Sequence, residues 1–152
     1  MESSFKFKRF EIENRKSALK VGTDAVLLGA AMTLRETDRF LLDIGTGTGV
    51  IALMAAQRLE SSRLSIEAID IDADSAEEAS RNFAASPWAG SLRAENTALS
   101  DYTPDRQFDC IFSNPPYYDN SLRNPDEREA VARHTESLSF TDICAFASEH
   151  LT

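Results

Sequence analysis

The chain has 152 residues, of which 42% are hydrophobic and 27% charged, and it carries a formal net charge of −9. This is the balance of a globular protein and excludes a fibrous or disordered class. Its longest apolar stretches, such as residues 50–56, are far shorter than the roughly 20 residues that span a bilayer, so we expect no membrane association.

The cysteines and the start of the chain bear on where the protein works. Cys110 and Cys144 stand far apart and lack Cys-x-x-Cys spacing, and no signal-peptide pattern opens the sequence. We therefore expect a reduced, cytoplasmic protein.

The charge is distributed unevenly along the chain. Residues 1–20 contain six lysines and arginines against three glutamates, whereas the remaining residues are strongly acidic. One interpretation is a solvated, charged strand. The other is a basic arm that binds a polyanion although the rest of the protein repels it.

The first expected elements lie in residues 5–31. Residues 5–13 alternate apolar and charged side chains, which predicts a half-buried strand or hairpin with Phe5 and Phe7 on one face. After Gly22, the side chains of Thr23 and Asp24 offer N-cap oxygens to a helix that continues to Ala31.

The rest of the chain alternates strands and helices. A short buried strand at 39–44 precedes a helix at 50–59 that is apolar nearly all round. A second strand at 64–69 precedes a helix at 74–85 that stops near Pro87. Two further strands, at 92–95 and 108–112, are joined by a loop, and a final helix covers 141–150. This alternation predicts a doubly wound α/β sheet.

We expect one domain over residues 1–152, with a basic strand or hairpin arm at 1–20 and the α/β core at 21–152. The strand at 108–112 is too apolar to remain an unpaired sheet edge. It predicts either further strands beyond Thr152, so that the sheet is truncated here, or coverage by another subunit.

Asp43 ends the first core strand and precedes a Gly-x-Gly-x-Gly turn at residues 45–49. Glycines permit positive φ and close approach of a ligand, and the helix that follows favours a negatively charged group. A dinucleotide fingerprint requires glycine or alanine where Val50 stands. Gly49 completes the tighter spacing associated with S-adenosylmethionine, although a turn without a ligand is the alternative.

Asp70 closes the second core strand, 21 residues after Gly49. A carboxylate at this place can accept hydrogen bonds from both hydroxyls of a ribose. The alternative is a solvated acid at the strand end. We expect the nearby Asp72 to cap the helix that follows.

The segment Asn114-Pro115-Pro116-Tyr117 follows the fourth core strand. Two prolines stiffen the loop, so that the Asn114 amide oxygen and the Pro115 carbonyl can accept hydrogen bonds from an exocyclic amino group. This directs the nitrogen lone pair toward an electrophilic methyl group, while Tyr117 offers a flat face for stacking. A Pro-Pro turn with a packed tyrosine is the alternative.

Other reactive residue types have simpler interpretations. His134 and His150 lack partners at metal-ligand spacing, so we expect no metal. Cys110 is expected to be a core thiol rather than a nucleophile. Trp88, in a loop, is expected to be a packed anchor.

In this order, Gly-x-Gly-x-Gly, Asp70 and Asn-Pro-Pro-Tyr resemble the class I S-adenosylmethionine-dependent methyltransferases that act on a planar amino nitrogen. Three further features, the segment from Lys20-Val21-Gly22-Thr23-Asp24 to Ala30, the loop 86–88 and the pair Tyr117-Tyr118, resemble bacterial tRNA (adenine-N6)-methyltransferases that modify the adenosine beside the anticodon of a valine tRNA. The resemblance implies a Rossmann-like fold and tRNA as partner, and leaves the oligomeric state open.

The resemblance also implies roles for individual residues. S-adenosylmethionine would be held by Asp43, Gly45, Thr46, Gly47 and Gly49 around its methionine part, by Asp70 at the ribose, and by Ile71 and Ala98 at the adenine. Ala98 replaces an acidic residue of the wider superfamily, so backbone or a neighbour such as Asp101 would contact the adenine amino group. Asn114, Pro115, Pro116 and Tyr117 would hold the target base.

The Asn-Pro-Pro-Tyr segment leaves the substrate open. It also occurs in methyltransferases for DNA adenine and for the glutamine amide of release factors, because each substrate presents an amino group on an sp² carbon. An rRNA base is a further alternative. A non-catalytic nucleotide-binding module is an alternative of another class.

Overall fold

The fold is described from a computed structural model, in residues 4–15, 21–115 and 139–152. A two-stranded antiparallel hairpin precedes a four-stranded parallel sheet with helices on both faces. The helices and strands are β1 (Ser4–Lys6), β2 (Glu11–Glu13), α1 (Thr23–Ala31), β3 (Phe40–Ile44), α2 (Val50–Leu59), β4 (Ser65–Asp70), α3 (Ala73–Ala84), β5 (Leu92–Asn96), β6 (Cys110–Ser113) and α5 (Phe140–His150), with short 3₁₀ turns at Ala89–Ser91 and Leu99–Asp101.

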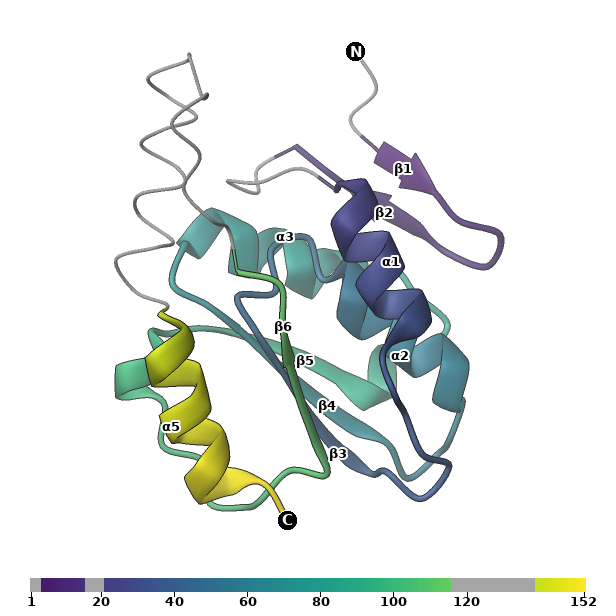
Figure 1. Ribbon diagram of the computed structural model, residues 1–152. Helices are drawn as coiled ribbons and strands as arrows, with labels where there is room; N and C mark the ends of the chain where they lie inside the picture. Colours follow the sequence, from purple (N-terminus) through teal and green to yellow (C-terminus); the bar gives the residue numbers. More distant parts are fainter. Residues whose placement is uncertain (1–3, 16–20, 116–138) are drawn as a thin grey trace.

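The parallel strands lie in the order β5-β4-β3-β6, which confirms the expected doubly wound sheet (Figure 1). From β3 the chain first adds β4 and β5 on one side and then returns to add β6 on the other. The strand order therefore reverses between β3 and β6. In open α/β sheets, ligands bind at the carboxyl ends of the strands beside such a reversal.

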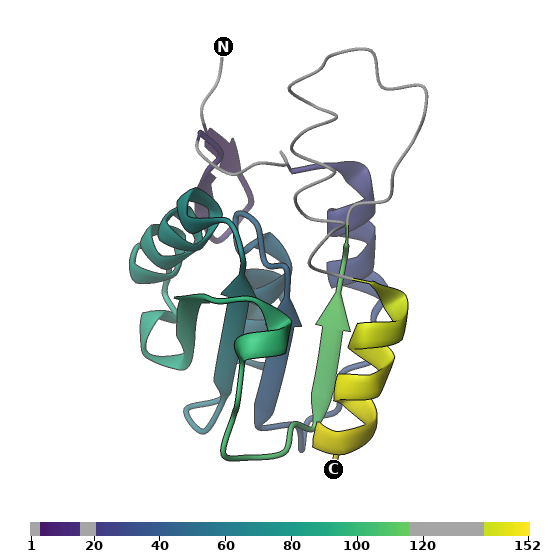
Figure 2. The ribbon, with the colours of Figure 1, turned by 90° about the vertical axis from the view of Figure 1, so that its left-hand side faces the viewer.

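The two faces of the sheet are covered by different helices (Figure 2). One face packs Leu41 and Ile66 against apolar residues of α2 and α3, and α1 packs outside α2. On the other face, Phe146 of α5 packs with Leu42 and Ile44 in a second cluster. Leu41 and Leu42 reach opposite faces because successive side chains of a strand point to opposite sides of the sheet.

Two helix starts differ in how well the sequence predicted them. The N-cap of α1 is Gly22, with no side-chain cap, so the predicted cap by Thr23 or Asp24 is wrong. Both residues already lie in the first turn, where the charge of Asp24 favours the helix dipole. The predicted cap of α3 is confirmed, because the carboxylate of Asp72 accepts a hydrogen bond from the Ser75 amide.

The β1–β2 hairpin is anchored by its second half. Phe10 and Ile12 are buried in the main core, whereas Phe5 is 44% exposed. The apolar side chains of the hairpin are therefore exposed near its start and buried near its end. Phe10 meets the ring of Trp88 edge-on, with centroids 5.7 Å apart. Trp88 is 9% exposed, which confirms that it is a packed anchor.

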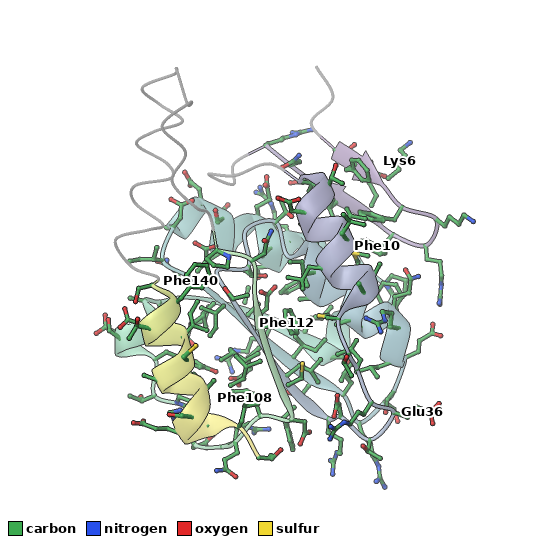
Figure 3. The ribbon with its side chains drawn as sticks, in the orientation of Figure 1. Lys6, Phe10, Glu36, Phe108, Phe112 and Phe140 are labelled. Carbon is green, nitrogen blue, oxygen red and sulfur yellow. The ribbon has the colours of Figure 1, made fainter. Side chains whose placement is uncertain are left out.

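The outer edge of the sheet beside β6 is partly paired by the chain itself. Phe108 and Leu151 form an isolated parallel bridge, in which the Phe108 amide donates to the His150 carbonyl at 2.7 Å. The Thr152 amide in turn donates to the Phe108 carbonyl at 3.0 Å. The apolar edge thus receives the pairing that its sequence requires at Phe108, which lies buried under α5 (Figure 3).

Within the described ranges, none of the helices combines the length and the apolar character that crossing a bilayer requires.

Candidate functional site

The glycine-rich turn lies across the carboxyl ends of β3 and β4. The amides of Gly45 and Thr46 both donate to the carbonyl of Ile69, at 2.8 and 3.0 Å. These bonds continue the pairing of β3 with β4 past the end of β3 and bend the turn toward Asp70.

The glycines of the turn meet different requirements. Gly45, Gly47 and Gly49 all have positive φ, at 73°, 58° and 86°, which favours glycine at each position. A Cβ on Gly47 would meet nothing within 4 Å, so this position borders open space. A Cβ on Gly49 would lie 2.5 Å from Cε1 of Phe83. Close packing on α3 therefore requires Gly49, whereas Gly47 has room for a ligand.

Asp70 lies at the end of β4 and is only 1% exposed. Its Oδ2 accepts the Gly47 amide at 2.8 Å, and its Oδ1 accepts the Asp72 amide at 2.9 Å. The alternative of a solvated strand-end acid is therefore wrong. The carboxylate joins the turn to the start of α3, which the strand-end position in the sequence did not reveal.

Asp43 lies at the end of β3 and is also 1% exposed. The Thr46 hydroxyl donates to its Oδ2 at 2.8 Å, but its buried Oδ1 has no hydrogen-bond partner among the described residues. Burial raises the pKa of Asp43 to about 7; the nearby charge of Asp70 adds to this rise, and the Thr46 hydroxyl and the Ala52 backbone oppose it. A buried carboxylate oxygen that has no hydrogen-bond partner fits a cationic ligand group.

The far side of the turn combines an apolar surface with a polar support. Ile71 follows Asp70 and is 39% exposed. The side-chain amide of Asn96, at the end of β5, donates to the carbonyls of Asp70 and Ile71 at 2.9 and 3.0 Å. Asn96 was not predicted from the sequence, although a polar residue at the end of the neighbouring strand was the available signal.

Ala98 begins the 3₁₀ turn after β5 and is partly buried. Its carbonyl accepts the amide of Asp101 at 3.0 Å. The Asp101 side chain is exposed. Both residues therefore lie just beyond the carboxyl end of β5, on the same edge of the sheet as Asp70.

The site continues where β6 ends. Ile44 and Ser113 are register partners, and the Ser113 hydroxyl donates to the Ile44 carbonyl at 2.7 Å. Asn114 and Pro115 follow, partly buried, and this register places Asn114 beside the entry to the glycine-rich turn. Pro116 and Tyr117 lie outside the described residues. The fold thus brings Asp43, Asp70 and Asn114, which are far apart in sequence, to one edge of the sheet.

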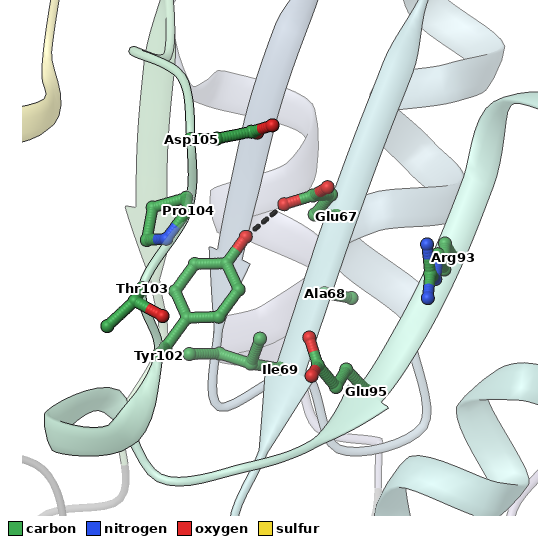
Figure 4. A pocket seen from close by; sticks show the side chains of 9 residues that line it. All are labelled: Glu67, Ala68, Ile69, Arg93, Glu95, Tyr102, Thr103, Pro104 and Asp105. Atoms are coloured by element: carbon green, nitrogen blue, oxygen red, sulfur yellow. Dashed lines mark hydrogen bonds between the residues drawn. The ribbon is translucent and has the colours of Figure 1, made fainter.

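A cavity of ≈ 320 Å³ lies on the face of the sheet that α5 covers in part, and its lining residues are drawn in Figure 4. Charged side chains of β4 and β5 line it, among them Glu67 and Arg93, and the segment after the second 3₁₀ turn closes it. Tyr102 donates a hydrogen bond to Glu67. Burial and this carboxylate raise the pKa of Tyr102, so the phenol stays protonated and ties the β5–β6 connection to the sheet.

Two further predictions concern reactive side chains. Burial raises the pKa of the Cys110 thiol, which disfavours the nucleophilic thiolate and agrees with a core role. In the part of the chain that the structure describes, no group of three His, Cys, Asp or Glu side chains could hold a metal ion.

Comparison with known proteins identifies the family. The sequence profile of the methyltransferase small domain matches residues 16–137. The chain belongs to the methyltransferase small domain family. The profile includes the glycine-rich turn, Asp70 and the Asn114 segment, and it confirms the methyltransferase resemblance seen in the sequence.

Among relatives of this methyltransferase small domain chain are two proteins named tRNA1(Val) (adenine(37)-N6)-methyltransferase. The protein of Pedobacter heparinus is 44% identical over 143 residues, which are 94% of this chain and 60% of the relative. The protein of Parabacteroides distasonis is 48% identical over 141 residues, which are 91% of this chain and 58% of the relative. The chain therefore spans about 60% of the length of these curated relatives.

A solved structure supports the fold assignment. It is a SAM-dependent methyltransferase from Thiobacillus denitrificans in complex with S-adenosyl-L-homocysteine, with a TM-score of 0.59 and 17% identity. The match covers 91% of this chain and 47% of the other. The expected Rossmann-like class I methyltransferase fold is thereby confirmed.

Proposed function

We propose that this chain carries an S-adenosylmethionine-dependent methyltransferase activity that methylates N6 of an adenine in tRNA, the anticodon-loop adenosine of a valine tRNA. The names of the two relatives support the substrate. Residues 1–152 would act as one cytoplasmic domain, with the hairpin as its basic arm. The observation that carries the cofactor assignment is the buried Oδ1 of Asp43, which has no hydrogen-bond partner among the described residues, at the start of a turn in which Gly47 borders open space.

The residues at the strand ends fit S-adenosylmethionine. The buried oxygen of Asp43 would accept the ammonium group of the methionine part, and a charge-assisted hydrogen bond would offset the cost of its burial. Gly45, Thr46 and Gly47 would leave room for the methionine chain, while Gly49 supports the turn from behind. Asp70, which accepts the amides of Gly47 and Asp72, would also accept the ribose hydroxyls, because each carboxylate oxygen can accept more than one hydrogen bond.

The adenine would lie against the exposed side chain of Ile71. Ala98 and Asp101 lie at the same edge, and backbone groups near Ala98 or the carboxylate of Asp101 would contact the adenine amino group. Because Asn96 fixes the backbone of Asp70 and Ile71, it would keep the ribose and adenine contacts in register.

When bound, the cofactor would supply the electrophilic methyl group. The Asn114 amide oxygen and the Pro115 carbonyl would accept hydrogen bonds from the adenine N6 amino group and orient its lone pair. Pro116 would stiffen this segment, and Tyr117 would stack on the base. The transfer would form the N6–C bond as the S–C bond of the cofactor breaks, release S-adenosylhomocysteine and pass the surplus N6 proton to water. These groups would work by position and polarisation, without a titrating base.

RNA fits the charge distribution better than a protein substrate does. The exposed Lys6 and Lys8 lie on the hairpin of an otherwise acidic chain, with Lys6 on its outer side (Figure 3). An acidic body needs a local positive surface to approach phosphates. A base in an anticodon loop also costs less to turn out than a base in a duplex.

The deciding experiment is transfer of labelled methyl groups from S-adenosylmethionine by the full-length protein to total tRNA, DNA or release factor. We expect label in tRNA at an adenine. Label in DNA or in release factor alone would replace the proposed substrate, and no transfer with no cofactor binding would favour a non-catalytic module.

Asn114→Ala provides the control for mechanism. It should lower turnover steeply, by about 100-fold or more, and leave cofactor affinity nearly unchanged, because its hydrogen bond acts mainly in the transition state. In a matched pair, Tyr117→Ala should weaken tRNA binding by about 1 to 3 kcal/mol through loss of stacking, and Tyr117→Phe should have little effect. Normal turnover of Asn114→Ala would remove Asn114 from the site.

A further inference from the structure

Asn82, on α3, lies outside the set of residues that the sequence assigned to the site. It is 2% exposed and uses both ends of its side-chain amide. Its Oδ1 accepts the Glu13 amide at 2.7 Å, and its Nδ2 donates to the Glu13 carbonyl at 3.0 Å and to the Thr48 carbonyl at 2.8 Å. One side chain therefore joins the end of the hairpin to the glycine-rich turn.

Other side chains of α3 act on the same two segments. Glu78, one turn before Asn82, is fully buried, and its Oε2 accepts the Arg15 amide at 2.8 Å. Phe83 and Ala79 fill the space behind Gly49. The helix thus holds residues 13–15 with two polar side chains and the rear of the turn with two apolar ones.

The turn benefits from such support because glycines, which restrict the backbone little, occupy three of its five positions. Three glycines in five positions leave a wide choice of backbone angles, and each of the three glycines adopts positive φ. Asp70 holds the turn at the Gly47 amide. Asn82 holds the next residue at the Thr48 carbonyl, from the side of α3. Together these bonds fix the 46–47 and 48–49 peptide units of the turn.

We propose that Asn82 is a positioning residue for cofactor binding. It sets the geometry of the glycine-rich turn through the Thr48 carbonyl and makes that geometry depend on the hairpin through Glu13. It does not belong to the catalytic machinery and would touch neither the cofactor nor the base. This inference rests on the proposed function, since it names the support of the same cofactor site.

The test measures S-adenosylhomocysteine affinity by calorimetry on purified full-length variants. Asn82→Ala should bind about tenfold more weakly, because the buried carbonyl of Thr48 and both backbone groups of Glu13 lose their partner. With S-adenosylmethionine raised to saturation, kcat should remain within about twofold of wild type, since the lost contact acts on binding before the chemical step. Asn82→Asp, which is isosteric but cannot donate to Thr48, should also weaken binding and decides the matter if the alanine variant fails to fold.

Two controls separate positioning from simple loss of stability. Arg81→Ala removes an exposed neighbour that pairs with the carboxylate of Glu13 at 3.3 Å, and it should leave affinity unchanged. Ile66→Val removes one buried methylene from the core and should lower the melting temperature without weakening binding. Folded Asn82 variants with wild-type affinity, or an equal loss of affinity in Ile66→Val at matched stability, would overturn the inference. Failure of the wild-type protein to bind S-adenosylhomocysteine would instead refute the proposed function.

Discussion

The ends of β3 and β4 carry two acids that are equally buried and differently used. Asp70, on β4, receives a backbone amide on each oxygen, whereas Asp43, on β3, keeps one oxygen without a partner among the described residues. The glycines repeat the contrast, because Phe83 packs behind Gly49 while Gly47 borders open space. Equal burial therefore accompanies two different arrangements, and the oxygen without a partner is the one for which we propose a ligand.

We expect the largest effect on stability at Gly49, behind which Phe83 packs. Gly49→Ala should lower the free energy of unfolding by about 2 to 4 kcal/mol, from overpacking against Phe83 and from alanine in a left-handed conformation. Gly47→Ala should cost only about 1 kcal/mol, since its Cβ meets no atom within 4 Å. Urea denaturation measures both. Equal losses would erase the distinction between the two positions.

Asp70→Ala should affect both folding and binding. It leaves the amides of Gly47 and Asp72 without their acceptor, so we expect about 2 to 3 kcal/mol less stability. Cofactor affinity should also fall by about 1 to 3 kcal/mol in calorimetry. A variant with weakened binding and undiminished stability would show that the backbone bonds of Asp70 contribute little.

Asp43→Asn should have separate effects on cofactor affinity and on the stability of the fold. We expect cofactor affinity to fall by about 1 to 3 kcal/mol through loss of the charge-assisted bond. The pH dependence has a defined sign. The pKa of Asp43 is about 7 in the folded chain against an ordinary 3.8, so the folded state keeps a proton that the unfolded state has released.

Stability from Asp43 should therefore fall as pH rises from about 4 to 7, by at most about 1.4 kcal/mol per pH unit, and stay level above that window. Denaturation of wild type and Asp43→Asn across this range measures the difference. Cofactor affinity of the wild type should rise with pH over the same window, because a cationic group favours the ionised carboxylate. A pH-independent difference between the two proteins would contradict the raised pKa.

The smallest expected effect concerns the hairpin. Arg9 is already engaged, since it pairs with Glu60 and lies over the Trp88 ring at 5.4 Å, whereas Lys6 and Lys8 are exposed. Replacing Lys6 and Lys8 by alanine should weaken tRNA binding and flatten its log-log salt slope by about 1.4, or about 0.7 for each phosphate contact. Arg9→Ala is the matched control and should leave the slope unchanged. Wild-type tRNA binding by the double lysine variant at every salt concentration would make the hairpin only a charged strand.

Much of the fold was readable from the sequence. The strand and helix alternation and the Asp72 cap follow from local periodicity and from side chains that bond their own backbone neighbours. The start of α1 was misread because Thr23 and Asp24 have the right chemistry for a cap, although the chain already turns into a helix after Gly22. Local sequence patterns thus located the helices and strands, but they did not identify the residue that caps the start of α1.

By itself, the sequence determined which strand ends carry acids, glycines and Asn114, because these depend only on residue order and period. Tertiary structure alone decided how each group is used. Whether Asp43 or Asp70 keeps an unpartnered oxygen depends on which backbone amides the fold brings to it, and whether Gly49 faces a ligand or Phe83 depends on how α3 packs. The role proposed for Asn82 likewise depends on tertiary structure, since residues 13, 48 and 82 meet only when the hairpin, the turn and α3 pack together.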